Sequence, residues 1–250
     1  MDIRRAFAYT TAATVTLIAL SACAGKGSGD TASEEKSFNL RGNRLVIDAR
    51  SVELKVLPGD GSGIHVQRWL SGTAAEPGNS SWTLDGDTLK LSVNCSGLVL
   101  DCGGRHQVSV PGDLSLVVRS GDGEYHLSGL SGSVVVEGGS GPVRADAMTG
   151  DLSITTQEGE ITVSNVRSRT LRASSDLGNV DVDFTAAPQL VDITSNAGDI
   201  TVKVPTTGQR YQVSIDSGTG QGGSRVPHDS RSRNVVKLHS AEGDATLFPC

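Results

Sequence analysis

Glycines recur at a fixed interval in the middle of this chain, and the interval constrains the fold more than any local propensity. Gly123, Gly132, Gly141, Gly150 and Gly159 lie nine residues apart, and alternating apolar residues follow each of them. Such a repeat indicates stacked units, because each unit leaves an apolar face that only its neighbour can cover. We expect these glycines to form tight turns that require a positive φ angle.

A second period indicates that the repeating unit is a pair of strands. Leu130, Met148, Val166 and Phe184 lie 18 residues apart, whereas the turns between them end in Gly and lack such an apolar residue. This alternation favours a β-solenoid built from two-strand coils of about 18–20 residues. The four apolar side chains would then form a ladder at one corner. An antiparallel meander of paired strands is the alternative.

The strands that precede the repeats are spaced irregularly. Trp82 and Leu84 lead through Asp85-Gly86-Asp87 into another alternating segment, which is typical of a β-hairpin. With 31 glycines and 4% aromatic residues, and no helical periodicity beyond the N-terminus, the fold class is all-β. We therefore expect an N-terminal β region, forming a sandwich-like cap, over residues 38–118 and the β-strand repeats over residues 119–250.

The C-terminal part of the repeats contains a long polar segment. We expect residues 218–234 to form a loop after a strand that contains Val213 and Ile215. Two further strands, marked by Val236 and Leu247, would then close the array. Terminal coils need such a cover, because open sheet edges invite other chains to pair.

The N-terminus has the features of an export signal. Arg4 and Arg5 precede an uncharged stretch, and Leu20-Ser21-Ala22-Cys23 resembles the bacterial lipobox, in which the cysteine is lipidated and becomes the new N-terminus. The sequence predicts a signal peptide at residues 1–22, lipid attachment at Cys23, and a flexible tether at residues 23–37. The protein would then lie on the outer face of the cell membrane. A short transmembrane helix is the alternative, but the apolar stretch is too short to span a bilayer.

The charge balance argues against nucleic acid as a partner. The chain has 22 basic and 28 acidic residues, which gives a net charge of −6. Loss of Asp2, Arg4 and Arg5 with the signal peptide makes the mature chain one charge more negative. An acidic protein without a basic stripe is repelled by phosphate backbones.

Three cysteines follow Cys23. Cys95 and Cys102 enclose a short segment, and outside the cytoplasm we expect them to form a disulfide. A metal site is the alternative, but His106 alone is too few additional ligands. Cys250 is left over, and the sequence leaves three states open: free, paired between molecules, or packed against the last strand.

No catalytic, metal or cofactor site is indicated by residue spacing. The five histidines lie at no recognisable ligand or triad spacing. The segment Gly218–Gly223 matches the dinucleotide-binding pattern of glycines, but polar loop residues follow it where a helix is required. Acidic residues on outward positions could bind calcium or serve a glycosidase, although they do not match the calcium-binding repeat; they are Asp181, Asp183, Asp192 and Asp199.

Four residues are candidates for ligand contact. Trp69 lies on the face opposite Ile64, where an exposed indole can stack on a sugar or peptide. Arg225, Arg231 and Arg233 form a basic loop that could contact an anionic wall polymer. The plainer interpretations are an indole packed against the disulfide segment or the tether, and a solvated loop.

Several motifs together resemble a known family. The lipobox, the segment Cys95–Cys102 (CSGLVLDC) and the repeated Gly-Asp-Leu-Ser-Ile and Gly-Asp-Ile-Thr-Val units are similar to those of bacterial "putative adhesin" lipoproteins with β-strand repeats. The resemblance implies a surface role without a defined ligand or catalytic residues. We expect a membrane-anchored binding or structural module without enzymatic activity, whose partner is a cell-wall polymer or surface protein. The alternatives are a carbohydrate-active β-helix enzyme and an envelope-stress or signalling accessory.

Overall fold

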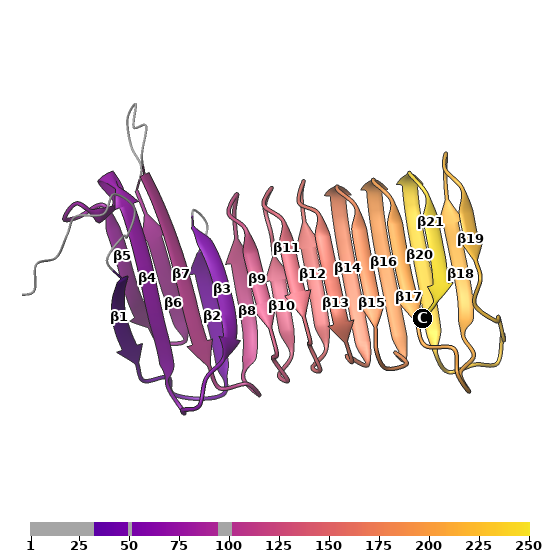
Figure 1. Cartoon of the computed structure of the whole chain (residues 1–250), viewed down its shortest axis with the longest axis horizontal. Helices are drawn as coiled ribbons and strands as arrows, with labels where there is room; N and C mark the ends of the chain where they lie inside the picture. Colours follow the sequence, from indigo (N-terminus) through magenta and orange to yellow (C-terminus); the bar gives the residue numbers. More distant parts are fainter. Residues whose placement is uncertain (1–32, 50–51, 95–101) are drawn as a thin grey trace, which may run out of the picture. The chain divides into compact units, whose positions relative to one another are not determined.

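The computed structural model describes residues 33–49, 52–94 and 102–250 (Figure 1). Within these residues the chain forms 21 strands and one 3-10 turn, Thr73–Ala75. No helix in the described part has the length and apolar character needed to cross a membrane. The predicted signal peptide and Cys23 lie outside the described residues. The strands are β1 (Ser33–Phe38), β2 (Arg44–Ala49), β3 (Glu53–Pro58), β4 (Ile64–Gly72), β5 (Ser80–Asp85), β6 (Thr88–Val93), β7 (Cys102–Val110), β8 (Ser115–Ser120), β9 (Tyr125–Ser128), β10 (Val134–Glu137), β11 (Val143–Asp146), β12 (Leu152–Thr156), β13 (Ile161–Val166), β14 (Thr170–Leu177), β15 (Val180–Phe184), β16 (Leu190–Ala197), β17 (Ile200–Val204), β18 (Gln212–Ser217), β19 (Gly222–Ser224), β20 (Val235–Glu242) and β21 (Ala245–Pro249).

The strands form two sheets that face each other. In the described residues one sheet has 11 strands in the order β1-β4-β7-β3-β9-β11-β13-β15-β17-β21-β19, and the other has 10 in the order β18-β20-β16-β14-β12-β10-β8-β2-β6-β5. From β8 to β17 each coil gives one strand to each sheet, and neighbouring coils pair in parallel. The predicted β-solenoid is confirmed, because parallel pairing excludes the meander.

The register reproduces the coil length expected from the sequence. Val134 lies opposite Leu116 on one side and Leu152 on the other, which are both 18 positions away. Leu171 and Val191 continue this row at slightly longer intervals. Alternate residues of each strand point between the sheets, so one continuous cluster of buried apolar side chains runs along the stack from Leu45 to Leu247.

The predicted corner ladder is present. Leu130, Met148, Val166 and Phe184 are all buried, with at most 2% of their surface exposed. Backbone hydrogen bonds join successive members of the ladder, at 2.8–3.0 Å. The N–H groups that follow Met148, Val166 and Phe184 donate to the carbonyl oxygens of Leu130, Met148 and Val166, respectively. The corner therefore continues the hydrogen-bonded stacking of the strands around the turn.

The recurring glycines have a different cause from the one expected. None of the five glycines from Gly123 to Gly159 has a positive φ. A Cβ atom on Gly141 would instead collide with the carbonyl oxygen of Gly123, and one on Gly150 with that of Gly132. The nine-residue interval alternates between two turns, and at each turn glycine is needed because backbones of successive coils touch.

Buried hydroxyl groups form a further ladder that the sequence analysis missed. Ser175, Ser195 and Ser240 are buried and lie at successive coil positions. Their Oγ atoms donate to the carbonyl oxygens of Gly159, Gly178 and Gly198, at 3.4, 3.2 and 2.8 Å respectively. These bonds satisfy polar groups that the close-packed turn removes from water.

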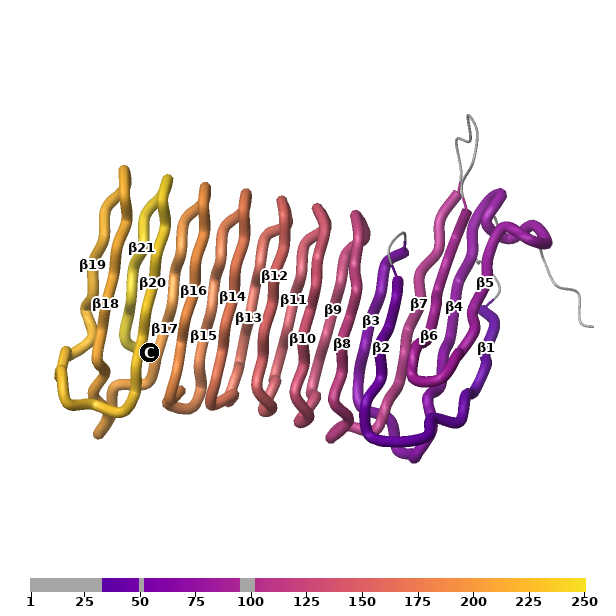
Figure 2. Tube along the Cα trace, turned by 180° about the vertical axis from the view of Figure 1, so that it is seen from behind, coloured from indigo at the N-terminus to yellow at the C-terminus, as the bar shows by residue number. Residues whose placement is uncertain are grey.

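At the C-terminal end the spatial order of the coils differs from the chain order. Strand β20 lies between β16 and β18, and β21 lies between β17 and β19 (Figures 1 and 2). The expectation that the last strands close the array is therefore wrong. The segment expected to be a loop contains β19, whose Gly222 and Gly223 pair with Ala245 and Thr246. The coil of β18 and β19 covers the end.

The N-terminal end, residues 33–112 where described, contains the antiparallel pairs. These are β1 with β4, β4 with β7, and the predicted hairpin of β5 and β6. Strand β1 begins at Ser33, so residues 33–37, which were expected to belong to the flexible tether 23–37, form a strand instead. Its Glu34 binds Arg68 at 2.6 and 2.8 Å, and its Lys36 Nζ donates to the Trp82 carbonyl at 3.3 Å. Polar residues can form this edge strand because their charges have partners.

Candidate functional site

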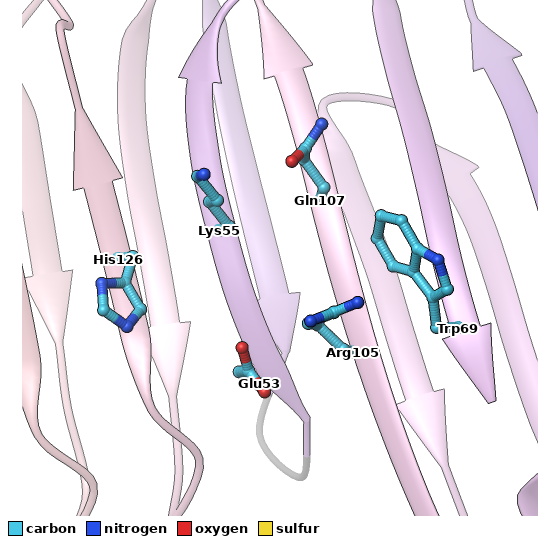
Figure 3. Close-up of a pocket in the computed structure, with 6 residues that line it drawn as sticks. All are labelled: Glu53, Lys55, Trp69, Arg105, Gln107 and His126. Carbon is cyan, nitrogen blue, oxygen red and sulfur yellow. The ribbon is translucent and has the colours of Figure 1, made fainter. Parts of the chain in front are cut away.

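A groove lies on the outer face of the eleven-stranded sheet, where the N-terminal end meets the first stacked coils. It has a volume of about 410 Å³. The term "groove" refers below to its lining residues, which are drawn in Figure 3: Glu53, Lys55, Trp69, Arg105, Gln107 and His126. They come from four neighbouring strands, β3, β4, β7 and β9.

Strand alternation explains why these polar side chains point outward. Leu54 and Val56 are buried between the sheets, so Glu53 and Lys55 on either side face solvent. The same alternation in β7 buries His106, whereas Arg105 is exposed and Gln107 is half-buried. The groove thus consists of the outward-facing residues of strands whose alternate, inward-facing residues belong to the core.

The strand register arranges the groove in two rows. In the first row, Trp69 lies opposite Arg105, which lies opposite Glu53. In the second, Gln107 lies opposite Lys55, which lies opposite His126. Residues up to 71 positions apart in the sequence, Lys55 and His126, are therefore side-by-side neighbours. Figure 3 shows their side chains on the same face of the sheet.

The groove holds two cations, Lys55 and Arg105, that have no acidic partner in the described part of the chain. The Arg105 guanidinium lies 4.5 Å from the centre of the Trp69 ring, which is half-buried. Among the described residues no carboxylate lies within 4.0 Å of the Arg105 or Lys55 cationic nitrogens. In contrast, His126 Nε2 is 3.0 Å from Glu124 Oε1. The same carboxylate oxygen also accepts a hydrogen bond from Arg144.

This arrangement suits recognition of a polar ligand. Lys55 and Arg105 can donate to anionic groups, and the Gln107 amide can donate and accept. Trp69 adds apolar aromatic surface beside them. Glu53 is the one carboxylate among the six lining residues. A pair of converging carboxylates, as a glycosidase needs, is therefore not part of the groove.

The basic residues expected to contact a ligand lie far from Trp69 in the fold. They belong to the segment between β19 and β20, at the C-terminal end. The guanidinium of Arg225 lies 5.0 Å from the ring centre of Phe248. Arg231 and Arg233 are exposed, and Arg231 is 3.9 Å from Asp229. The structure thus brings Trp69 together with a set of residues that the sequence analysis did not identify.

The predicted disulfide stays a prediction, because Cys95 lies outside the described residues. Cys102 is the first residue of β7. Cys250 is an exposed free cysteine, and its Sγ lies 3.2 Å from the carbonyl oxygen of Phe184. Although the residue as a whole is exposed, partial burial of its thiol raises the pKa of that group. No cluster of three or more His, Cys, Asp or Glu that could hold a metal was found in the described parts of the chain.

The four acidic residues noted in the sequence are dispersed. Asp181 and Asp183 line a shallow depression on the outer face of the eleven-stranded sheet. Burial, followed by the nearby Glu160 carboxylate, raises the pKa of Asp181. Asp192 lies on the other sheet, and the Asp199 side chain accepts a hydrogen bond from the Asp244 backbone in a turn. They do not converge on one groove.

A buried polar pair lies beneath the groove. His106 is fully buried, and neither of its ring nitrogens has a hydrogen-bond partner in the described structure. It lies opposite Arg68, whose guanidinium also stacks 4.0 Å from the Trp82 ring centre. Burial, and secondarily the positive charge of Arg68, lowers the pKa of His106 to about 4. The imidazole is therefore neutral at pH 7.

The fold and groove define a two-sheet parallel β-solenoid with a polar surface depression. A family model described as "Toastrack DUF4097" matches residues 113–247. The chain belongs to this Toastrack family. A search of curated proteins found no match.

Solved structures share the fold at low sequence identity. One is a "putative adhesin" from Bacteroides fragilis, with a TM-score of 0.56 and 13% identity, over 88% of this chain and 98% of that one. Another is a "putative adhesin" from Parabacteroides distasonis, with a TM-score of 0.51 and 10% identity, over 89% and 98%. At this identity the similarity shows the fold alone.

The family match and the groove cover different parts of the chain. Of the six lining residues, His126 alone lies within residues 113–247. The family model therefore accounts for the stacked coils that support the groove. The residues that give the groove its chemistry come from the strands before the matched region.

Proposed function

We propose that this protein is a membrane-anchored binding module of the extracytoplasmic surface, and that the groove is its ligand site. The observation that carries the proposal is the pair of cations, Lys55 and Arg105, which have no carboxylate partner among the residues that the structure describes and lie beside the half-buried Trp69. Unpaired cations beside an aromatic ring give a site both binding energy and orientation. A rigid sheet holds these side chains at fixed spacing.

The anchor in this proposal is a lipid on Cys23. Two acyl chains bury enough methylene groups for stable attachment to a bilayer. Residues 24–32 would connect the anchor to β1, which begins at Ser33. The ligand would be a polymer or protein of the envelope, and an oxidising location would allow Cys95 and Cys102 to pair.

The test is retention of envelope components by the purified full chain. We expect immobilised protein to retain material from a cell-wall fraction, and Lys55→Gln with Arg105→Gln to reduce retention about tenfold or more. Arg172→Gln is the matched control, since Arg172 is an exposed cation on the opposite sheet. Equal retention by the groove double variant and the control would refute the proposed site.

The anchor is tested separately. Replacement of Cys23 with Ala should move the protein from the membrane fraction to the soluble fraction, because the acceptor thiol is lost. Fractionation followed by immunoblotting measures the shift. Unchanged membrane association of the variant would refute lipid attachment at Cys23 while leaving the groove proposal intact.

A further inference from the structure

We infer that the ligand of the groove is an anionic polysaccharide, in which isolated carboxylate or phosphate groups are carried on hydroxylated sugar rings. This inference rests on the proposed function and specifies the ligand class. Three features of the groove support it: the sparse distribution of its charges, the chemistry beside Trp69, and its extension across several strands.

The charges of the groove favour a ligand of low charge density. Lys55 and Arg105 attract anionic groups, but Glu53 lies directly opposite Arg105 in the strand register. Glu124 lies beside His126 at the edge of the groove. The whole chain has a net charge of −6. A densely charged polymer would place anionic groups against these carboxylates, whereas isolated groups can reach the two cations alone.

The surroundings of Trp69 match a sugar ring. A sugar has an apolar face of C–H groups and an edge of hydroxyls, and an indole ring can pack against the apolar face. The Gln107 amide and the Glu53 carboxylate lie in the same groove. Together they can accept and donate hydrogen bonds to the hydroxyls. A simple anion would use the cations and leave these groups without a role.

The groove is long enough for several linked rings. It crosses four strands, from Trp69 on β4 to His126 on β9, which at the usual spacing of strands corresponds to about 14 Å. The register row that contains His126 continues outward through Arg144 and Thr162 on β11 and β13. A polymer can therefore continue along the sheet beyond the groove. An enclosed pocket, in contrast, would hold one small molecule.

Binding measurements with defined polymers test the ligand class. The probes for the full chain are two sparsely charged polymers, polygalacturonate with most of its carboxylates methyl-esterified and lightly phosphorylated dextran. Their uncharged counterparts are fully methyl-esterified polygalacturonate and dextran. Polyglutamate supplies dense carboxylates without sugar rings. Vesicles of phosphatidylglycerol and phosphatidylcholine supply phosphate in a lipid headgroup. We expect at least one charged polysaccharide to bind about tenfold more tightly than its uncharged counterpart, and more tightly than polyglutamate or vesicles.

The variants connect this binding to the groove. Lys55→Gln and Trp69→Leu should each weaken binding of the charged polysaccharide about five- to tenfold, whereas Arg172→Gln should leave it unchanged. Equal binding of charged and neutral polymers, or a preference for polyglutamate or vesicles, overturns the inference. If every probe fails while envelope material is still retained through Lys55 and Arg105, the ligand class is wrong and the proposed site stands. If neither polysaccharide binding nor retention of envelope material depends on Lys55 and Arg105, both the ligand class and the proposed site are wrong.

Discussion

The coils of residues 113–204 and the N-terminal end share two sheets but are stabilised differently. Among the coils every described strand pair is parallel, and glycine stacking and corner bonds recur at equivalent positions. The N-terminal end has the antiparallel pairs and both tryptophans, Trp69 and Trp82. The repeat fixes the backbone spacing of the coils but does not determine which side chains lie on their outer faces. The irregular N-terminal end supplies the large side chains that a binding site needs.

The two regions also differ in how completely their buried polar atoms are satisfied. In the described residues, the buried side-chain atoms without a hydrogen-bond partner belong to Arg68, Thr73 and His106, all in the N-terminal end. Among the coils, buried hydroxyls such as that of Ser195 bind a glycine carbonyl. Unsatisfied buried groups cost stability, so the end that carries the groove is the less optimised part of the fold.

The largest expected effect tests the close stacking of the coils. Gly141→Ala would place a Cβ against the backbone carbonyl of Gly123, which cannot move without separating two coils. We expect the free energy of unfolding to fall by more than about 3 kcal/mol. Urea unfolding monitored by circular dichroism measures the loss.

A second glycine gives the matched control for this substitution. Nothing lies within 4 Å of the position that a Cβ would take on Gly223, in the outer strand β19. Gly223→Ala should change stability by less than about 0.5 kcal/mol. Equal effects of the two substitutions would show that contact between coils is not the reason for the recurring glycines.

A pH effect of comparable size should arise in the N-terminal end. The folded pKa of His106 is about 4, below its ordinary value of 6.5, because burial and Arg68 disfavour the charged ring. The unfolded chain therefore binds the proton more tightly, and stability that is complete above pH 6.5 is lost as the pH falls towards 4. The corresponding loss is about 3 kcal/mol.

His106→Leu should remove this part of the pH dependence. Urea unfolding of the wild type and the variant at pH 7 and pH 4.5 measures the difference between them. His239→Gln is the control, since His239 is exposed and lies 3.1 Å from Asp216 at the other end of the chain. If His106→Leu loses as much stability in acid as the wild type, protonation of His106 does not weaken the N-terminal end.

The smallest expected effect is a gain of stability within the coils. Ala147 has a φ of 53°, and Gly129 and Asn165 occupy the equivalent corner positions of neighbouring coils with φ of 68° and 54°. An alanine is strained in this conformation, so Ala147→Gly should stabilise the protein by about 0.5–1 kcal/mol. Ala145→Gly, at a buried strand position two residues earlier, should destabilise it. Thermal unfolding compares the two; a loss in both would contradict the assignment of strain to Ala147.

The coils could be predicted from the sequence because their contacts are repeated. The 18-residue interval of Leu130, Met148 and Val166 specifies which residues stack, and the structure confirms it. The predicted role of the recurring glycines, a positive φ in tight turns, was wrong, because a glycine needed for a turn and one needed for close backbone stacking look alike in sequence. The serines of the buried ladder, Ser175 and Ser195, had the spacing of one coil and could have been found by the same rule.

The groove could be predicted only in part. Trp69 was identified, but Lys55 and Arg105 were not, because nothing in the sequence states that β3 pairs with β7. These strands are separated by β4, β5 and β6 in the chain. The register of irregular strands depends on packing across the whole end, and a single sequence contains no period from which to read it.

The placement of β20 and β21 has a consequence for synthesis of the protein. Among the described strands, β18 is hydrogen-bonded within its sheet to β20 alone, and β19 to β21 alone. The coil of β18 and β19 therefore joins the two sheets only when residues 235–249 have inserted between it and the preceding coil. A premature stop before Val235 would remove β20 and β21 and leave β18 and β19 without hydrogen-bonded neighbours, so the loss of one coil would disorganise two.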